Sequence, residues 1–300
     1  TGWDIGLKTD SVGSRQSARV SLMYRPPYDW PAVIAFLQVR ATPGVESVDA
    51  DCYRRTIACD GVAGSIVVSR ATDADALWLD VHGATARSTP TIVERVKRMF
   101  DVAADSIALA GYLASDPLLT RACAVHAGIR VPGAWDPFEL SVRAILGQQI
   151  TVRAATTIAA RVAARWGTPA DDRHGLNRLF PNAAQLAGAR LEEAGIITTR
   201  ANAIRSLAKA VCDRSLLFDS PSTLAALTAI RGIGEWTAQY IAMRSLGQPD
   251  AFPSGDVVLR RMAGGCSRRK LDARAERWRP YRSYAVMLLW QTATEDCRLN

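Results

Sequence analysis

Two groups of residues in the last third of the chain have types and spacing that suit chemistry. Gly232-Ile233-Gly234 forms a short turn, and Asp256 lies twenty-two residues after Gly234. Glycines allow positive φ and let the backbone approach another group closely, and we expect both glycines to serve this purpose. The helix that follows would point unpaired amides at an anion such as a DNA phosphate. The alternative role of such a turn is that of a simple tight corner.

Aromatic side chains follow the turn at helical spacing. Trp236 and Tyr240 are four residues apart, so they share one helix face and can line one pocket. Electron-rich rings attract cations. Trp290 ends an apolar stretch over 284–290. The alternative for these aromatic residues is ordinary core packing.

The composition favours a folded protein with a polyanionic partner. The chain has 300 residues, 48% of them hydrophobic, and a formal net charge of +8. Its six cysteines are scattered without a CxxC pair, which argues against a zinc site and suits a reducing compartment. No apolar run approaches the ~20 residues that cross a bilayer. The first twenty residues are too polar for a secretory signal.

The chain divides into three expected segments. Residues 1–18 are predicted to be a linker or the remnant of a longer polypeptide, because they lack periodicity. Residues 19–112 are predicted to form a mixed antiparallel α+β domain, with a hairpin turn at Asp60-Gly61. Residues 113–300 are predicted to be helical, with the turn flanked by helices within 224–246. The expected fold class is therefore α+β, a small antiparallel domain packed on an all-helical core.

Several separate segments together resemble the helix-hairpin-helix DNA glycosylase superfamily, and most closely the AlkA-type 3-methyladenine DNA glycosylases. The similarity covers nearly the whole chain after about residue 19. The segments that carry it are Pro26-Pro27-Tyr28-Asp29-Trp30, Ala144-Ile145-Leu146-Gly147-Gln148-Gln149, Gly232-Ile233-Gly234-Glu235-Trp236-Thr237-Ala238, Gly255-Asp256 and Trp278-Arg279-Pro280-Tyr281-Arg282-Ser283-Tyr284-Ala285.

The resemblance implies a catalytic role for Asp256. A carboxylate near the deoxyribose stabilises the oxocarbenium-like state and can orient or deprotonate a water. Its alternative role as a helix N-cap is compatible with this one. Bifunctional relatives carry a lysine where this chain has Trp236. Since an indole cannot form a Schiff base, the implied reaction is monofunctional hydrolysis.

The resemblance also implies how DNA is held. Trp236, Tyr240 and Trp290 would surround the flipped base, with Val257 where the family has another aromatic residue. The wedge that fills the gap in the base stack would fall on Gln149, beside Gln148. Capping of helix ends is the alternative for these two glutamines. The DNA-binding set is Gly232, Gly234, Thr237, Gln148 and Gln149.

Two further features concern ions and phosphates. By the resemblance, the backbone carbonyls of Thr228, Ile230 and Gly232 would hold a monovalent cation, Na⁺ or K⁺. No redox or organic cofactor is expected. A late basic cluster, from which some side chains should reach phosphates, consists of Arg260, Arg261, Arg268, Arg269, Lys270, Arg279 and Arg282.

These features predict a monofunctional DNA glycosylase that removes alkylated, and possibly deaminated, purines from duplex DNA. It would flip the base and leave an abasic site. The alternatives are a non-catalytic helix-hairpin-helix module, which needs no pocket, and a bifunctional glycosylase-lyase for oxidised purines. We expect a monomer in the bacterial cytoplasm, associated with the nucleoid and not with a membrane.

Overall fold

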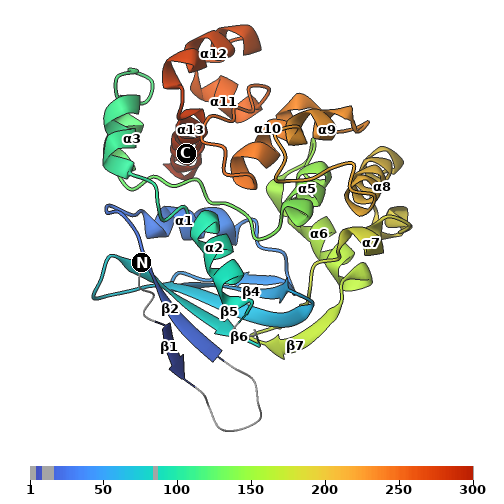
Figure 1. Cartoon of the computed structure of the whole chain (residues 1–300). Helices are drawn as coiled ribbons and strands as arrows, with labels where there is room; N and C mark the ends of the chain where they lie inside the picture. The colour runs from blue at the N-terminus through green and yellow to red at the C-terminus, as the bar shows by residue number, and fades with distance from the viewer. Residues whose placement is uncertain (1–4, 9–16, 84–86, 300) are drawn as a thin grey trace.

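The computed structural model describes residues 5–8, 17–83 and 87–299 (Figure 1). Six antiparallel strands form one sheet in the order β1-β2-β6-β5-β4-β3. Their bounds are β1 Ile5–Lys8, β2 Ser17–Met23, β3 Glu46–Val48, β4 Cys52–Cys59, β5 Val62–Arg70 and β6 Ala76–His82. The predicted Asp60-Gly61 turn joins β4 to β5, with φ of 51° and 76°. Two positive φ values suit a two-residue hairpin because they match the strand twist.

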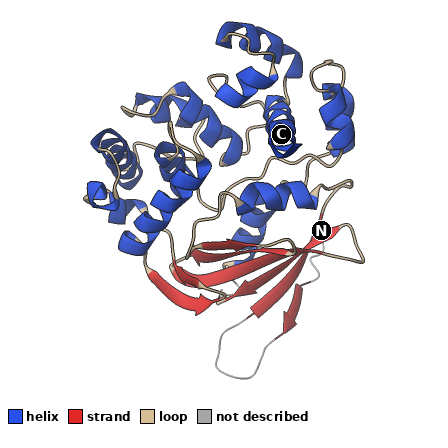
Figure 2. Cartoon of the chain, turned by 180° about the vertical axis from the view of Figure 1, so that it is seen from behind, coloured by secondary structure: helices blue, strands red, loops and turns tan. Residues whose placement is uncertain are grey.

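Helices cover one side of this sheet (Figure 2). Helix α1 (Trp30–Gln38) begins where the Asp29 carboxylate accepts a hydrogen bond from the Ala32 amide at 3.0 Å, as its sequence predicts. Helix α2 (Thr89–Met99) has Pro90 in its first turn. Both helices bury their apolar residues against the strands, including Val33 and Val96.

The rest of the chain is mostly helical. The helices are α3 Ser106–Leu113, α4 Thr120–Val125, α5 Pro137–Leu146, α6 Val152–Trp166, α7 Ala183–Leu186, α8 Thr198–Cys212, α9 Thr223–Ala229, α10 Glu235–Arg244, α11 Val257–Met262, α12 Arg268–Ala275 and α13 Arg282–Leu299, with 3-10 turns η1 Leu191–Ala194 and η2 Glu276–Trp278. The antiparallel sheet with its own helices and the separate helical core confirm the predicted α+β class.

The molecule has two apolar cores, and the first combines residues from the two ends of the chain. The first contains the sheet and α1–α4 together with α11–α13. The second contains the buried faces of α5–α10. The C-terminal helices therefore return to the N-terminal domain. Helix α10 contributes to both cores, because Ala242 and Met243 belong to the first and Ala238 and Ile241 to the second. Any cleft between α10 and α11 lies where the cores meet.

Two expected boundaries need correction. The predicted linker over 1–18 contains strand β1 and the start of β2, while residues 1–4 and 9–16 lie outside the described part. Its Ile5–Lys8 segment is too short to show periodicity, so the strand had no sequence signal. Helix α3 crosses the predicted boundary at 112.

The segment 113–300 is also not all helical. It contains a small hairpin of β7 (Pro169–Arg173) and β8 (Leu176–Arg178). The hairpin binds the N-terminal domain, because the Arg178 carbonyl accepts a hydrogen bond from Thr56 Oγ1 at 2.6 Å. Figure 1 shows β7 beside the edge of the sheet. This tertiary pairing, rather than a local pattern, explains a strand with the sequence Pro-Ala-Asp-Asp-Arg.

Candidate active site

The predicted turn joins α9 to α10. Gly232 has φ of +98°, and a Cβ there would approach Ala203 Cβ to 2.9 Å, so this position requires glycine. Gly234 is the N-cap of α10 with φ of −83°. The expectation of positive φ at Gly234 is therefore wrong. A Cβ at Gly234 would meet no atom within 4 Å, which leaves open space in front of the first amides of α10.

Asp256 is the N-cap of α11. Its Oδ1 accepts a hydrogen bond from the Leu259 amide at 3.0 Å, which confirms the capping alternative. Two indoles also point at this carboxylate. Trp236 Nε1 lies 3.2 Å from Oδ2 and Trp290 Nε1 lies 3.3 Å from Oδ1. Asp256 is partly exposed, so the carboxylate is held by three donors while it still faces a cavity.

The three predicted aromatic residues come together beside Asp256. Trp236 and Tyr240 stack with ring centroids 5.4 Å apart and planes at 11°. Tyr240 and Trp290 lie 6.2 Å apart at 49°. Phe36 stacks on Trp290 at 6.4 Å. Sequence reasoning missed Phe36, because it looked like an ordinary apolar residue of α1.

These side chains border a cavity of about 1050 Å³, a volume that holds a purine with room to spare. Trp290 packs against the first core and Tyr240 against the second. Val257, 74% exposed, stands at the edge. None of the described residues that line this cavity is a lysine.

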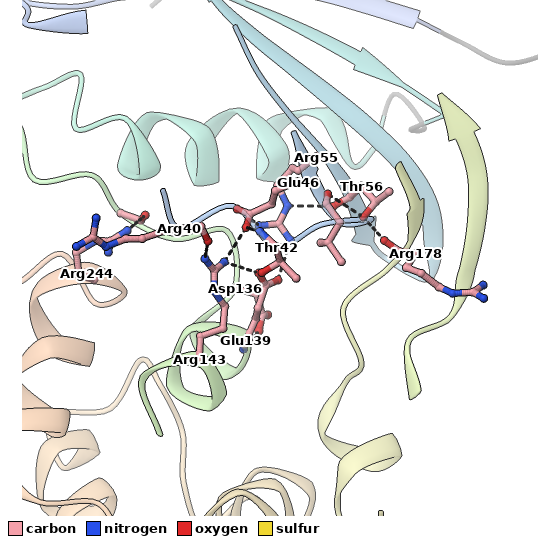
Figure 3. A network of polar contacts seen from close by, with 12 residues as sticks. Arg40, Thr42, Glu46, Arg55, Thr56, Asp136, Glu139, Arg143, Arg178 and Arg244 are labelled. Atoms are coloured by element: carbon pink, nitrogen blue, oxygen red, sulfur yellow. Dashed lines mark hydrogen bonds and ion pairs between the residues drawn. The ribbon is translucent and has the colours of Figure 1, made fainter. Parts of the chain in front are cut away.

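A network of charged residues, drawn in Figure 3, lines part of the cavity. Arg143 Nη1 lies 2.8 Å from Glu46 Oε2 and 3.1 Å from Glu139 Oε1. Arg55 Nη2 lies 2.7 Å from Glu139 Oε2. Figure 3 shows Arg143 pointing between the two carboxylates and the Arg40 carbonyl, to which it also donates. The network ties α5 to the N-terminal domain.

Tyr240 meets this network at its hydroxyl. Arg244 Nη1 donates to it at 2.9 Å, and the charge of Arg40 also acts on it. Arg244 is buried, and it donates to the main-chain oxygens of Pro132 and Gly133. Both guanidinium groups also lie over the Phe36 ring, at 3.7 Å for Arg40 and 4.5 Å for Arg244. Sequence reasoning found no sign of these arginines.

Burial and nearby charges shift the pKa of Tyr240 in opposite directions. Burial alone would raise the pKa of the Tyr240 hydroxyl, but the charges of Arg244, Arg40 and Arg143 together lower that pKa below its ordinary value. Burial lowers the pKa of Arg244 to about 10. Burial would raise the pKa of Glu46, and Arg143 and Arg55 hold it below its usual range.

The two glutamines behave differently from each other, and neither caps a helix. Gln148 Nε2 donates to the Gly232 carbonyl at 2.9 Å and to Thr237 Oγ1 at 3.0 Å, so it joins the end of α5 to the turn. Thr151 caps α6 instead. Gln149 is exposed with φ of +58°. Its side chain is thus presented at the cavity edge by the turn between α5 and α6.

Thr237 is buried at the border of the cavity. It is only 2% exposed, and its hydroxyl accepts a hydrogen bond from Gln148 at 3.0 Å. In this structure Thr237 therefore holds Gln148, and its contact with DNA stays a prediction.

The late basic cluster splits into paired and unpaired residues. Arg279 and Arg282 both form ion pairs with Asp250, and Arg268 pairs with Glu235. Arg261 lines the cavity, and Arg260 Nε donates to the Cys266 carbonyl at 3.2 Å. The part of the cluster nearest the cavity is therefore the part on α11.

Comparisons with known proteins agree with this geometry. The model of the AlkA N-terminal domain matches residues 19–136. The model of the HhH-GPD superfamily of base excision DNA repair proteins matches residues 142–278. DNA-3-methyladenine glycosylase 2 of Escherichia coli K12 is 32% identical over 279 residues, which cover 91% of this chain and 96% of that protein.

This chain belongs to the AlkA family of DNA glycosylases. Another relative is the probable bifunctional transcriptional activator/DNA repair enzyme AlkA of Mycobacterium tuberculosis. It is 35% identical over 291 residues, which cover 94% of this chain. The chain spans 58% of the length of that relative.

Solved structures share the fold of this AlkA-family chain. The 3-methyladenine DNA-glycosylase from Archaeoglobus fulgidus superimposes with a TM-score of 0.79 at 21% identity, over 92% of this chain and 98% of that one. An 8-oxoguanine glycosylase/lyase from Clostridium acetobutylicum, in complex with DNA, gives 0.74 at 16% identity, over 97% and 98% of the two chains. Across the described residues, no helix is long and apolar enough to cross a membrane.

Proposed function

We propose that this chain is a monofunctional DNA glycosylase. It hydrolyses the N-glycosidic bond of alkylated purines in duplex DNA, with deaminated purines as a second candidate substrate class, and leaves an abasic site. The damaged nucleotide is flipped out of the helix into the cavity beside Asp256. Water is the nucleophile, and it adds to C1′ of the deoxyribose after the base departs.

One observation carries this proposal. Asp256 sits at the meeting point of two indoles and an aromatic cavity large enough for a purine. As the base departs, positive charge grows on the sugar, and a fixed carboxylate stabilises that charge at no cost in reorganisation. The same carboxylate can take the proton from the attacking water.

The lack of an amine nucleophile separates this proposal from a glycosylase-lyase. The residue that follows Gly-Ile-Gly-Glu is Trp236, whose Nε1 donates to Asp256. No lysine lines the cavity within the described part of the chain. A Schiff base requires such an amine. The cavity itself argues against a purely DNA-binding module, since phosphate binding by a turn needs no aromatic pocket.

The partner in this proposal is double-stranded DNA that contains a damaged base. Open space beside Gly234 would let a phosphate approach the first amides of α10, and exposed Gln149 would enter the base stack. We propose a monomer that works in the bacterial cytoplasm at the nucleoid. The net charge of +8 favours this location on DNA.

A monovalent cation at the turn is also a proposal. It would bind the backbone carbonyls of Thr228, Ile230 and Gly232. The Gly232 oxygen already accepts a hydrogen bond from Gln148, and the Ile230 oxygen accepts one from the Ile233 amide. A carbonyl has two lone pairs, so these bonds leave room for an ion. Its chemistry would be to bridge the turn and a phosphate.

The test is base release from DNA treated with a methylating agent, with each free base identified by chromatography. We expect free 3-methyladenine and 7-methylguanine, together with abasic sites in the DNA. Tight DNA binding without any released base would favour the binding module. Release of oxidised purines with strand cleavage would favour the lyase.

A further inference from the structure

The turn between α5 and α6, residues 147–150, is bonded to three other parts of the helical core through one residue. Gln148 Nε2 donates to the Gly232 carbonyl at 2.9 Å and to Thr237 Oγ1 at 3.0 Å. These two bonds use both hydrogens of the amide. The Gln148 carbonyl accepts a hydrogen bond from Arg200 Nη2. The α5–α6 turn is therefore tied to the α9–α10 turn, to α10 itself and to α8.

The next residue of the α5–α6 turn has a backbone shape that needs such support. Gln149 is exposed at the cavity edge, with φ of +58°. A residue with a Cβ disfavours this left-handed region, and it persists there only where surrounding contacts fix the backbone. The backbone hydrogen bonds within the turn are long, at 3.3 Å from the Gln148 amide to Ile145 and 3.5 Å from the Ile150 amide to Gly147. The contacts of Gln148 thus supply much of the support.

The partners of Gln148 are themselves closely packed. A Cβ on Gly232 would lie 2.9 Å from Ala203 Cβ and 3.9 Å from the Thr199 carbonyl oxygen, so the start of α8 lies directly against the α9–α10 turn. Ala203 and Ile233 belong to the same apolar core. Arg200 lies one turn before Ala203 on this part of α8. Gln148 is therefore held by a packed unit whose parts keep fixed relative positions.

We propose that Gln148 and Arg200 are positioning residues for base flipping, which fix Gln149 at a set place relative to the α9–α10 turn. This inference rests on the proposed glycosylase function, with Gln149 as the wedge. The α9–α10 turn would hold a phosphate, while the wedge fills the gap that the flipped base leaves. Both must act on the same few nucleotides. A wedge that is already fixed relative to the phosphate site loses little freedom on insertion, so flipping costs less.

The test follows release of 7-methylguanine in single-turnover experiments on two duplexes. They differ only opposite the damaged base, where one has cytosine and the other an abasic-site analogue. The methyl group lies in the major groove and leaves the pairing edge intact, so only the first duplex opposes flipping by base pairing. A variant that impairs flipping alone should suffer on the paired duplex, because an unpaired base is cheaper to flip.

Gln148→Ala is the first variant. It removes both hydrogen bonds of the amide, and we expect release from the paired duplex to slow by about ten- to a hundredfold. Release from the unpaired duplex should slow by less than about threefold. A 2-aminopurine base beside the lesion gives a second readout, since its fluorescence rises when it is unstacked. This rise on binding to the paired duplex should be smaller in Gln148→Ala than in the wild type.

Two further comparisons test whether Gln148 acts through its neighbour. Gln149→Ala should show the same dependence on pairing, and the double variant Gln148→Ala/Gln149→Ala should be no slower than Gln149→Ala, because both changes act on one step. Arg200→Met should resemble Gln148→Ala. Arg200→Lys retains a donor for the Gln148 carbonyl and should recover most of the rate.

Gln38→Ala is the matched control. Gln38 Nε2 also donates to a main-chain carbonyl, that of Val48, at 3.3 Å, but Gln38 does not line the cavity. This variant should change neither rate. Circular dichroism checks the fold of every variant.

Three results would overturn the inference. The first is equal slowing on both duplexes in Gln148→Ala, which would mean that the residue supports the fold or the chemistry. The second is an unchanged rate on the paired duplex in Gln148→Ala or in Gln149→Ala. The third is a double variant in which the two losses multiply in full. If the wild-type protein releases the base from neither duplex, the proposed function itself fails, and the inference falls with it.

Discussion

Trp236 Nε1 donates to Asp256 Oδ2 across 3.2 Å, so a residue of α10 is bonded to the N-cap of α11. Helix α11 packs in the first apolar core, and α10 contributes to both cores. The proposed catalytic carboxylate is therefore placed by the meeting of both cores and not by its own loop. This arrangement suits electrostatic catalysis, which depends on charges that are fixed before the reaction.

The two glycines of the turn should respond differently to substitution. Gly232→Ala places a Cβ 2.9 Å from Ala203 Cβ at φ of +98°, and we expect it to lower the free energy of unfolding by about 1–3 kcal/mol. Gly234→Val adds a side chain to open space. It should fold normally and weaken binding to damaged and undamaged duplexes alike. Denaturant unfolding and affinity on both duplexes measure these effects, and a loss confined to damaged DNA would contradict the phosphate role of Gly234.

Trp290 combines a ring face with a hydrogen bond to Asp256. Trp290→Ala should lower excision of cationic bases more than that of hypoxanthine, because an aromatic face attracts a cation by about 0.5–2 kcal/mol. Trp290→Phe keeps a ring and removes the N–H donor, so it separates the two contributions. Single-turnover rates for both classes of base decide the matter. Equal losses on both would show that Trp290 supports the pocket wall or Asp256 and does not read charge.

Asp101 should make stability depend on pH. Burial raises the pKa of its carboxyl to about 6. Because the folded-state pKa is above the unfolded value, the stabilising contribution is complete below about pH 4 and is lost as pH rises through about 6. Asp101→Asn keeps the shape and tolerates the φ of 49° at this position. We expect Asn to raise the free energy of unfolding at pH 8 by ~1–3 kcal/mol and to flatten the profile between pH 4 and 6. Thermal unfolding across this range measures it, and parallel profiles for both proteins would contradict the assignment.

The wild-type protein should not cut DNA strands. A labelled duplex with a damaged base is treated with the protein and run on a denaturing gel with and without hot alkali. Nicks should appear only after alkali, because no lysine among the described residues lines the cavity. Trp236→Lys should not simply add lyase activity, since the indole also holds Asp256. A protein–DNA adduct trapped by borohydride with the wild type would reveal an amine that this account lacks.

The parts of the site that sequence could predict are local. Asp256 was predictable because an Asp before an apolar turn of helix is good capping chemistry, and the bond to Leu259 is present. Trp236 and Tyr240 share a helix face by their spacing alone, and their rings stack. The α5 start at Asp136-Pro137 was also predictable, and Asp136 accepts from the Glu139 amide at 2.8 Å.

The parts that sequence could not predict depend on tertiary structure. Arg40, Arg143 and Arg244 are far apart in the chain, and each looks like an ordinary surface arginine at the end of a helix. Only the docking of the two domains brings them to one hydroxyl. The same holds for Phe36, which reaches Trp290 across 254 positions of sequence. The spacing of the aromatic residues therefore gave no sign of the polar groups in the pocket.

Asp256→Asn tests the central claim most directly. The amide keeps the shape of the side chain and an acceptor for the Leu259 amide, but it removes the negative charge opposite the oxocarbenium ion. We expect single-turnover release of 3-methyladenine to fall by about several hundred-fold, a loss of ~3–4 kcal/mol, with affinity for the damaged duplex nearly unchanged. Release at more than about a tenth of the wild-type rate would contradict the account, because it would remove Asp256 from the reaction.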